Sequence, residues 1–184
     1  MADKMMYRPK AVLGCQTNFS FLCGASHPEE LVAHAHHLGW QAVGIADRFS
    51  CGGLVRAHMA IKDIAAQNNP DQKPVPSLSL DKLICGVGVS LHNGGDILCY
   101  SRTLDGYHSL CQWLSAAMMR SGHNNRALPD MHISDLGRLS SDVIVITLPP
   151  VLADTDYREQ ARTIRLFAPG DVYVGGYVMR DGCD

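Results

Sequence analysis

The sequence predicts an α/β fold in which strands and helices alternate along a parallel sheet or barrel. Short apolar runs bounded by turn residues recur along the chain, and amphipathic helical patterns separate most of them. The run 82–91 is almost entirely apolar, as a strand buried on both faces should be. Alternation of this kind favours parallel pairing. In such folds functional side chains gather at the carboxyl ends of the strands.

The expected strands are short apolar runs that end at polar or glycine-rich stretches. They cover residues 10–18, 41–47, 82–91, 96–101, 141–150 and 171–179. The sequence HNGG at 92–95 is a turn signal, so 82–91 and 96–101 are expected to form a hairpin. The proline-rich stretch 68–81 and the polar stretch 121–131 are expected to be loops.

The expected helices cover residues 26–39, 53–67, 105–119 and 156–170, with one or two helical turns over 132–140. In the first helix, Ser26 is expected to cap the first turn and Glu29 to complete a capping box. Its apolar face is expected to comprise Leu31, Ala35 and Leu38.

Two further helices show apolar stripes that should face a core. The stripe of 53–67 consists of Leu54, His58, Ile61 and Ala65. The stripe of 105–119 consists of Leu110, Trp113, Leu114 and Ala117.

Composition favours one folded domain in a reducing compartment. Of the 184 residues, 46% are hydrophobic and 18% are charged, which argues against disorder, and the net charge of −2 does not indicate unaided nucleic-acid binding. No apolar run approaches the roughly 20 residues that cross a bilayer, and the start of the chain lacks a signal-peptide pattern. The seven cysteines are scattered, without a Cys-x-x-Cys pair. We therefore expect a cytoplasmic protein with reduced thiols and no membrane partner.

The segment VGIADRFSCGG at 43–53 contains the first candidate functional residue. It is a short apolar strand that ends at Asp47, followed by Arg48 and a glycine-rich turn. A carboxylate at a strand tip is a common metal ligand, but an adjacent arginine does not suit a metal site. The segment therefore indicates either a site of another kind or one that has lost its metal.

A longer stretch, TNFSFLCGASHPEELVAHAHHLGWQAVGIADRFSCGGLVRAH at 17–58, resembles a known family. It is similar to the N-terminal polymerase and histidinol phosphatase (PHP) domain of the bacterial DNA polymerase III alpha-subunit family, most closely the error-prone, damage-inducible branch. The resemblance continues in LICGVGVSL and ILCYSRTLDGYHSLCQWLS, and so covers nearly the whole chain. It implies a distorted (β/α)7 barrel with up to three metals at the strand tips.

The family's early metal-ligand positions are mostly changed in this chain. Its His-x-His motif falls on Gly14 and Gln16, its Asp-His motif on Asp47 and Arg48, and a strand-ending glutamate position on Gly88. Zinc and manganese sites need several imidazole and carboxylate ligands, and of these positions only Asp47 retains one. The resemblance therefore implies a remnant site with no metal and no catalytic residue.

The expected partner of Asp47 is Arg48 or another local donor in place of a metal. A simpler interpretation, Asp47 as a turn or helix-cap acid before Ser50, is compatible with this one. His34 and His37 share a helix face, and we interpret them as solvated surface residues. His58 is interpreted as a packed or capping histidine.

Cys15, Cys23 and Cys51 leave open a thiolate site near the strand tips, although no paired base is evident.

The resemblance also implies a piece of a larger protein. The chain, 1–184, is expected to be a PHP domain truncated before its last strands, an incomplete barrel without the polymerase palm, fingers and thumb. The implied function is a non-catalytic structural module of an error-prone DNA-directed DNA polymerase in damage-induced mutagenesis and translesion synthesis. Its partners would be the rest of the polymerase, DNA through the full-length protein, and mutagenesis accessory proteins.

No cofactor is expected in this chain, whereas Mg²⁺ serves the full-length polymerase family. The alternative function is a metal-dependent phosphoesterase or 3′–5′ proofreading exonuclease of the PHP superfamily.

Overall fold

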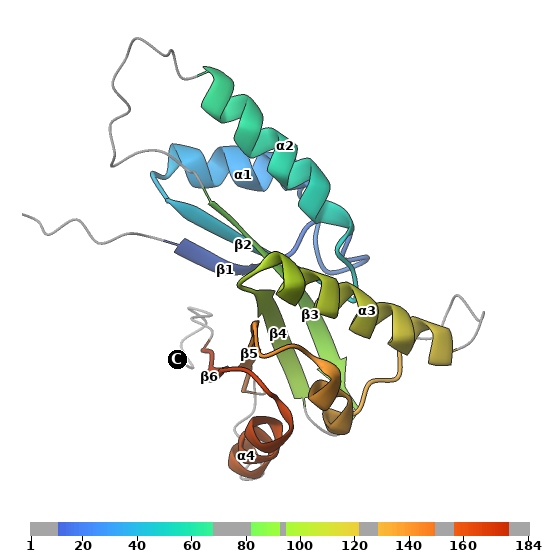
Figure 1. The fold of residues 1–184 in the computed structure, drawn as a ribbon. Coiled ribbons are helices and arrows are strands. Elements are labelled where there is room, and N and C mark those ends of the chain that lie inside the picture. The colour runs from blue at the N-terminus through green and yellow to red at the C-terminus, as the bar shows by residue number, and fades with distance from the viewer. Residues whose placement is uncertain (1–10, 68–81, 93–94, 122–128, 150–156, 177–184) are drawn as a thin grey trace, which may run out of the picture. The chain divides into compact units, whose positions relative to one another are not determined.

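The structure, a computed structural model, describes residues 11–67, 82–92, 95–121, 129–149 and 157–176 (Figure 1). The chain divides into two compact units, Met1–Cys85 and Gly86–Asp184, and the boundary falls within strand β3. The expected loop 68–81 lies outside the described residues, as do parts of the loop 121–131 and of the strand 171–179. Each unit is described by itself below.

The first unit is built on two parallel strands, β1 (Ala11–Cys15) and β2 (Ala42–Arg48). The register pairs Val12 with Val43 and Cys15 with Ile45, so it shifts between Val12 and Cys15. Gly14 lies at this irregularity with a φ of 75°. This left-handed conformation suits glycine, because a side chain there would be strained. Strand β2 is buried from Ala42 to Asp47, so it forms the centre of the unit.

Two helices pack on these strands, α1 (Pro28–His37) and α2 (Gly52–Gln67). They contact each other and β2, and Figure 1 shows them side by side on the same side of β2. The predicted cap of α1 is wrong by one residue. The N-cap is His27, whose N–H donates to Glu30 Oε2 at 2.8 Å. Glu29 instead accepts from Arg56 Nε of α2 at 2.5 Å, so it links the two helices.

The buried faces of both helices differ from the predicted stripes at their edges. On α1 the buried residues are Pro28, Val32 and Ala35, and Leu38 is exposed because it already belongs to the C-cap. On α2 the buried apolar side chains are those of Leu54, Ala57 and Ile61.

His58 and Ala65 of α2 are exposed, so the interpretation of His58 as a packed residue is wrong. His34 and His37 of α1 are exposed, which confirms that they lie on a solvated helix face.

The described part of the second unit begins within β3 (Lys82–Leu91), at Gly86. In the sheet, β3 is followed by β4 (Gly95–Ser101), β5 (Val143–Thr147) and β6 (Val172–Val174). Strands β3 and β4 are antiparallel, which confirms the predicted hairpin, although residues 93–94 of its turn are not described. Strands β4 and β5 are also antiparallel, and β5 and β6 are parallel. Beyond the predicted hairpin, the antiparallel pairing of β4 with β5 departs from the parallel pairing that the alternation of strands and helices predicted.

Two of the three pairings in this unit match their connections, whereas β4 and β5 are antiparallel although helical segments lie between them in the chain. A short hairpin produces antiparallel neighbours, and parallel neighbours need a crossover connection, usually a helix. Helix α4 (Tyr157–Phe167) supplies such a crossover between β5 and β6.

Helix α3 (Leu104–Arg120) forms the core of this unit with β4 and β5. Its four predicted inward residues, Leu110, Trp113, Leu114 and Ala117, are all buried. The expected turns at 132–140 are the 3-10 helix η1 (Ile133–Arg138), which contacts both α3 and α4. Trp113 Nε1 donates to the Asp135 carbonyl at 3.0 Å, so the indole N–H buried with α3 has a partner on η1.

Within the described part of the chain, no helix combines the length and apolar character that crossing a bilayer requires.

Candidate functional site

Asp47 is a buried carboxylate at the carboxyl end of β2, only 1% exposed. Its Oδ1 accepts hydrogen bonds from Thr17 N at 2.6 Å and from Ser20 Oγ at 2.6 Å. Its Oδ2 accepts from Thr17 Oγ1 at 2.8 Å. Both carboxylate oxygens are therefore occupied by donors from the segment that follows β1, which compensates the cost of burying the charge.

The segment that follows β1 is held in shape by its own turns. Ser20 N donates to the Thr17 carbonyl at 2.9 Å, and Phe19 N donates to Thr17 Oγ1 at 3.1 Å. Ser20 Oγ also accepts from Arg48 N at 3.0 Å while it donates to Asp47. We call the side chains of Thr17, Ser20 and Asp47, together with the Arg48 amide, the Asp47 network. It joins the tip of β2 to the segment after β1, 27 to 30 residues away in sequence.

Thr17 and Ser20 are as buried as the acid they bind, and each is 0% exposed. Three donor groups therefore depend on one carboxylate, since no water has access to them. Such an arrangement can hold two backbone segments together. A carboxylate has about four lone-pair sites, and these donors take three of them, so at most one site is left for a metal ion.

The other predicted site residues do not supply ligands around Asp47. Gly14 and Gln16 lie at the end of β1, where neither brings an imidazole. The Arg48 guanidinium carbon lies 5.9 Å from the centre of the Phe49 ring. Gly88 belongs to the second unit, where it is buried in β3 and paired with Leu98 of β4.

Among the described residues, no group of three His, Cys, Asp or Glu side chains is arranged to hold a metal. The donor set therefore does not fit the metal cluster that the family resemblance implies.

The sequence predicted Arg48 or another local donor as the partner of Asp47, whereas the donors Thr17 and Ser20 lie 27 to 30 residues away in sequence. The sequence indicated only one of these two donor residues as lying near the strand tips. Thr17 stands at the end of the first expected strand, but Ser20 was not singled out. The signal available was the T-N-F-S spacing, since threonine and serine favour turns through hydrogen bonds to nearby backbone groups. That spacing does not reveal which acid the hydroxyls bind.

The structure does not favour the thiolate alternative. Burial raises the pKa of the Cys15 thiol, which opposes formation of a nucleophilic thiolate. Cys23 is exposed and Cys51 is half-buried. In the second unit, complete burial raises the pKa of Cys99 to about 12.

We predict that thiol alkylation at neutral pH distinguishes these cysteines. Cys23 should react with iodoacetamide first, because its thiol is exposed. Cys99 should stay unmodified until the protein is unfolded, because its thiol is buried and protonated. Peptide mass spectrometry after timed quenching measures both rates. Labelling of Cys99 in the native protein at a rate similar to Cys23 would contradict the buried position of β4.

Comparison with known proteins agrees with this fold. The PHP domain family model matches residues 13–167. The chain is 31% identical over 177 residues to an error-prone DNA polymerase of Brucella abortus, covering 96% of this chain and 15% of that polymerase. It is 32% identical to one from Bordetella parapertussis and 34% identical to one from Rhodopseudomonas palustris, covering 15% and 12% of their lengths. The chain thus spans less than a sixth of these relatives and matches their N-terminal region.

A solved structure shows the same fold. It is a protein of Bifidobacterium adolescentis, provisionally assigned as a metal-dependent phosphoesterase, with a TM-score of 0.57 and 13% identity. The match covers 90% of this chain and 78% of that one. The α/β fold is therefore of the PHP type, and the described residues contain six strands. With the profile match over most of its length, the chain belongs to the PHP domain family.

Proposed function

We propose that this chain is a PHP module of an error-prone DNA polymerase, with a structural and non-catalytic role. The similarity to the N-terminal region of error-prone polymerases supports the polymerase context. Because the chain spans only 12–15% of these relatives, nucleotide transfer would belong to the rest of such a polymerase. DNA, mutagenesis accessory proteins and a role in translesion synthesis would then concern the full-length assembly.

The Asp47 network is the observation that carries the non-catalytic part of the proposal. A phosphoesterase of this superfamily would need metals at the strand tips to polarise the phosphate and activate water. Here the retained carboxylate accepts three hydrogen bonds from buried donors. Gly14, at one of the former histidine positions, has a left-handed backbone that suits glycine. The acid serves as an anchor between β2 and the segment after β1.

An activity assay tests this proposal against the phosphoesterase and exonuclease alternative. The purified 184-residue chain should release no product from p-nitrophenyl phosphodiesters or 3′-labelled single-stranded DNA with Mg²⁺, Mn²⁺ or Zn²⁺. It should also incorporate no nucleotide, because it spans only 12–15% of the polymerases that it matches. The assay compares the chain with an Asp47→Asn variant whose folded fraction is verified by circular dichroism. Turnover that is abolished in folded Asp47→Asn would show that the site is catalytic and would overturn the proposal.

Metal analysis provides a second measurement on the parent chain and the Asp47→Asn variant. The amount of Zn²⁺, Mn²⁺ or Fe bound after dialysis should not differ between the parent chain and Asp47→Asn. One equivalent of metal lost with the Asp47 carboxylate would contradict the anchor role.

A further inference from the structure

An exposed apolar surface lies on the first unit, beside the start of α2. In the segment after β1, the side chains of Phe21 and Leu22 are 84% and 90% exposed, and we call these two residues the tip. On α2, the side chains of Val55 and Met59 are 68% and 52% exposed. We call these four side chains, together with that of Phe19, which is 39% exposed, the apolar face.

Phe19 joins the two parts of the apolar face. A Cβ built at Gly52, the first residue of α2, would lie 2.7 Å from Phe19 Cδ1, so the ring packs against the start of the helix. Figure 1 shows the segment after β1 beside this end of α2. Gly52, Val55 and Met59 lie three and four residues apart, a spacing that places them on one side of the helix. The apolar face therefore continues from the tip along the first turns of α2.

Backbone hydrogen bonds hold the tip in a fixed turn. The amides of Cys23 and Gly24 both donate to the Ser20 carbonyl at 2.9 Å. The Ser20 hydroxyl donates to the buried carboxylate of Asp47. The Asp47 network thus supports the turn from which the two apolar side chains of the tip project.

Leu22 adopts a left-handed backbone conformation with a φ of 62°. This conformation is strained for a bulky residue, whereas glycine adopts it freely. The leucine side chain gains little burial within the chain, because most of its surface is exposed. A strained backbone that presents an exposed apolar side chain is explained if a surface outside this chain covers that side chain.

The area of the apolar face suits one half of a dimer interface. At the observed exposures its five side chains present roughly 600 Å², since a large apolar side chain has about 150–250 Å² of surface. A standard interface covers about 800 Å² on each partner, and homodimer interfaces are about 65% apolar, which requires roughly 500 Å² of apolar surface per copy. The face is also at the upper end of the roughly 300–600 Å² that the largest apolar patch of a monomer presents.

The apolar face fits a second copy of itself in shape and charge. The projecting tip lies next to the exposed side of α2, so a two-fold axis can place the tip of each copy on the helix of the other. Arg56, the cation beside this side of α2, is paired with Glu29 of its own chain at 2.5 Å. Two copies would therefore not bring unpaired arginines together.

We propose that the apolar face binds a second copy of this chain in a symmetric dimer. The tip of each copy packs against Val55 and Met59 of the other copy. Every contact then occurs twice, so one substitution removes two contacts per dimer. The proposal concerns the chain by itself and does not rest on the proposed polymerase role.

Sedimentation velocity of the full 184-residue chain over a range of concentrations tests the dimer. We expect a species of about 40 kDa, twice the 20.0 kDa of one chain, that dissociates on dilution. Leu22→Gly should raise the dissociation constant at least about 10-fold, because two apolar contacts are lost. This substitution suits the φ of 62°, so the circular dichroism of the variant should match that of the parent chain.

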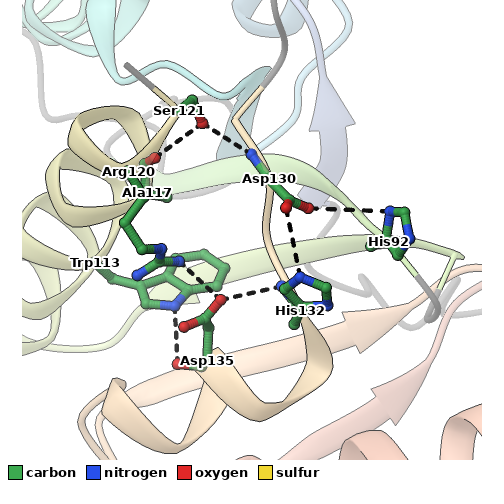
Figure 2. A network of polar contacts seen from close by, with 8 residues as sticks. All are labelled: His92, Trp113, Ala117, Arg120, Ser121, Asp130, His132 and Asp135. Carbon is green, nitrogen blue, oxygen red and sulfur yellow. Dashed lines mark hydrogen bonds and ion pairs between the residues drawn. The ribbon is translucent and has the colours of Figure 1, made fainter.

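A matched pair of methionine substitutions locates the interface. Met59→Lys should also raise the dissociation constant at least about 10-fold, because it buries an unpaired charge in the dimer. Met119→Lys is the control and should leave the constant unchanged. Met119 is an exposed methionine of α3 in the second unit, next to Arg120, which donates to Asp135 in the polar network of Figure 2.

A double substitution tests whether the tip meets the helix of the other copy. Combining Leu22→Gly with Met59→Lys should raise the dissociation constant by less than the product of the two single effects, because both act on one contact. Independent effects would contradict the packing of the tip on α2.

A chain that stays monomeric at its highest soluble concentration would refute the dimer and would assign the apolar face to a different partner, such as the linked remainder of a polymerase. A dimer that Leu22→Gly and Met59→Lys both leave intact would also refute the proposal, because another surface would then hold the two copies together. Neither result bears on the activity assay, so failure of the dimer is distinct from failure of the proposed function.

Discussion

Replacement of Asp47 by alanine should lower the free energy of unfolding by about 3–5 kcal/mol, the largest effect we expect from a single substitution in this chain. The change leaves three buried donors without an acceptor: the Thr17 amide and the hydroxyls of Thr17 and Ser20. Each unsatisfied buried group costs about 1–3 kcal/mol, and partial relaxation of the loop keeps the total below the full sum.

Urea unfolding followed by circular dichroism measures this effect. Asp63→Ala is the matched control, because Asp63 is an exposed acid of α2 in the same unit. It should change stability by less than about 0.5 kcal/mol. EDTA should leave the urea unfolding curve of the parent chain unchanged if the Asp47 carboxylate binds only protein donors. An Asp47→Ala protein as stable as the parent would show that the Asp47 network does not hold the fold together.

Gly24→Ala should destabilise the protein by about 3 kcal/mol, the second largest effect. A Cβ at this position would lie 2.1 Å from the Thr17 carbonyl oxygen and 2.6 Å from its carbon. Both are backbone atoms of the residue that donates twice to Asp47, so the clash cannot be relieved by rotating a side chain. The loop must move, and the network must lengthen or break.

Gly137→Ala is the control for this substitution. The nearest atom to its added Cβ is the Phe167 carbonyl oxygen at 3.7 Å, an ordinary contact distance. Combining Gly24→Ala with Asp47→Ala should cost less than the sum of the two, because both act through Thr17. Additive losses in the double variant would show that the glycine contact and the carboxylate network are independent.

The sequence by itself determined most of the elements and the character of the candidate site. Helix α3 is the clearest example, because all four residues of its predicted stripe are buried. The hairpin of β3 and β4 followed from the HNGG turn. The sequence also showed that Asp47 lies near the carboxyl end of the second strand and that positions 14, 16 and 48 lack histidine. These features depend on neighbours within about one helical turn or one strand, which is the range over which residue patterns carry information.

Tertiary structure alone decided the partners of the buried acid, the antiparallel pairing of β4 with β5 and the edges of the helix faces. Ser20 and Asp47 are 27 residues apart, and no local pattern specifies that a hydroxyl in one turn meets a carboxylate at another strand's end. His58 continues an apolar stripe by spacing, yet it is exposed because the helix buries Ala57 instead. Burial depends on what packs against each face, and an unpaired buried charge must find donors wherever the folded chain brings them.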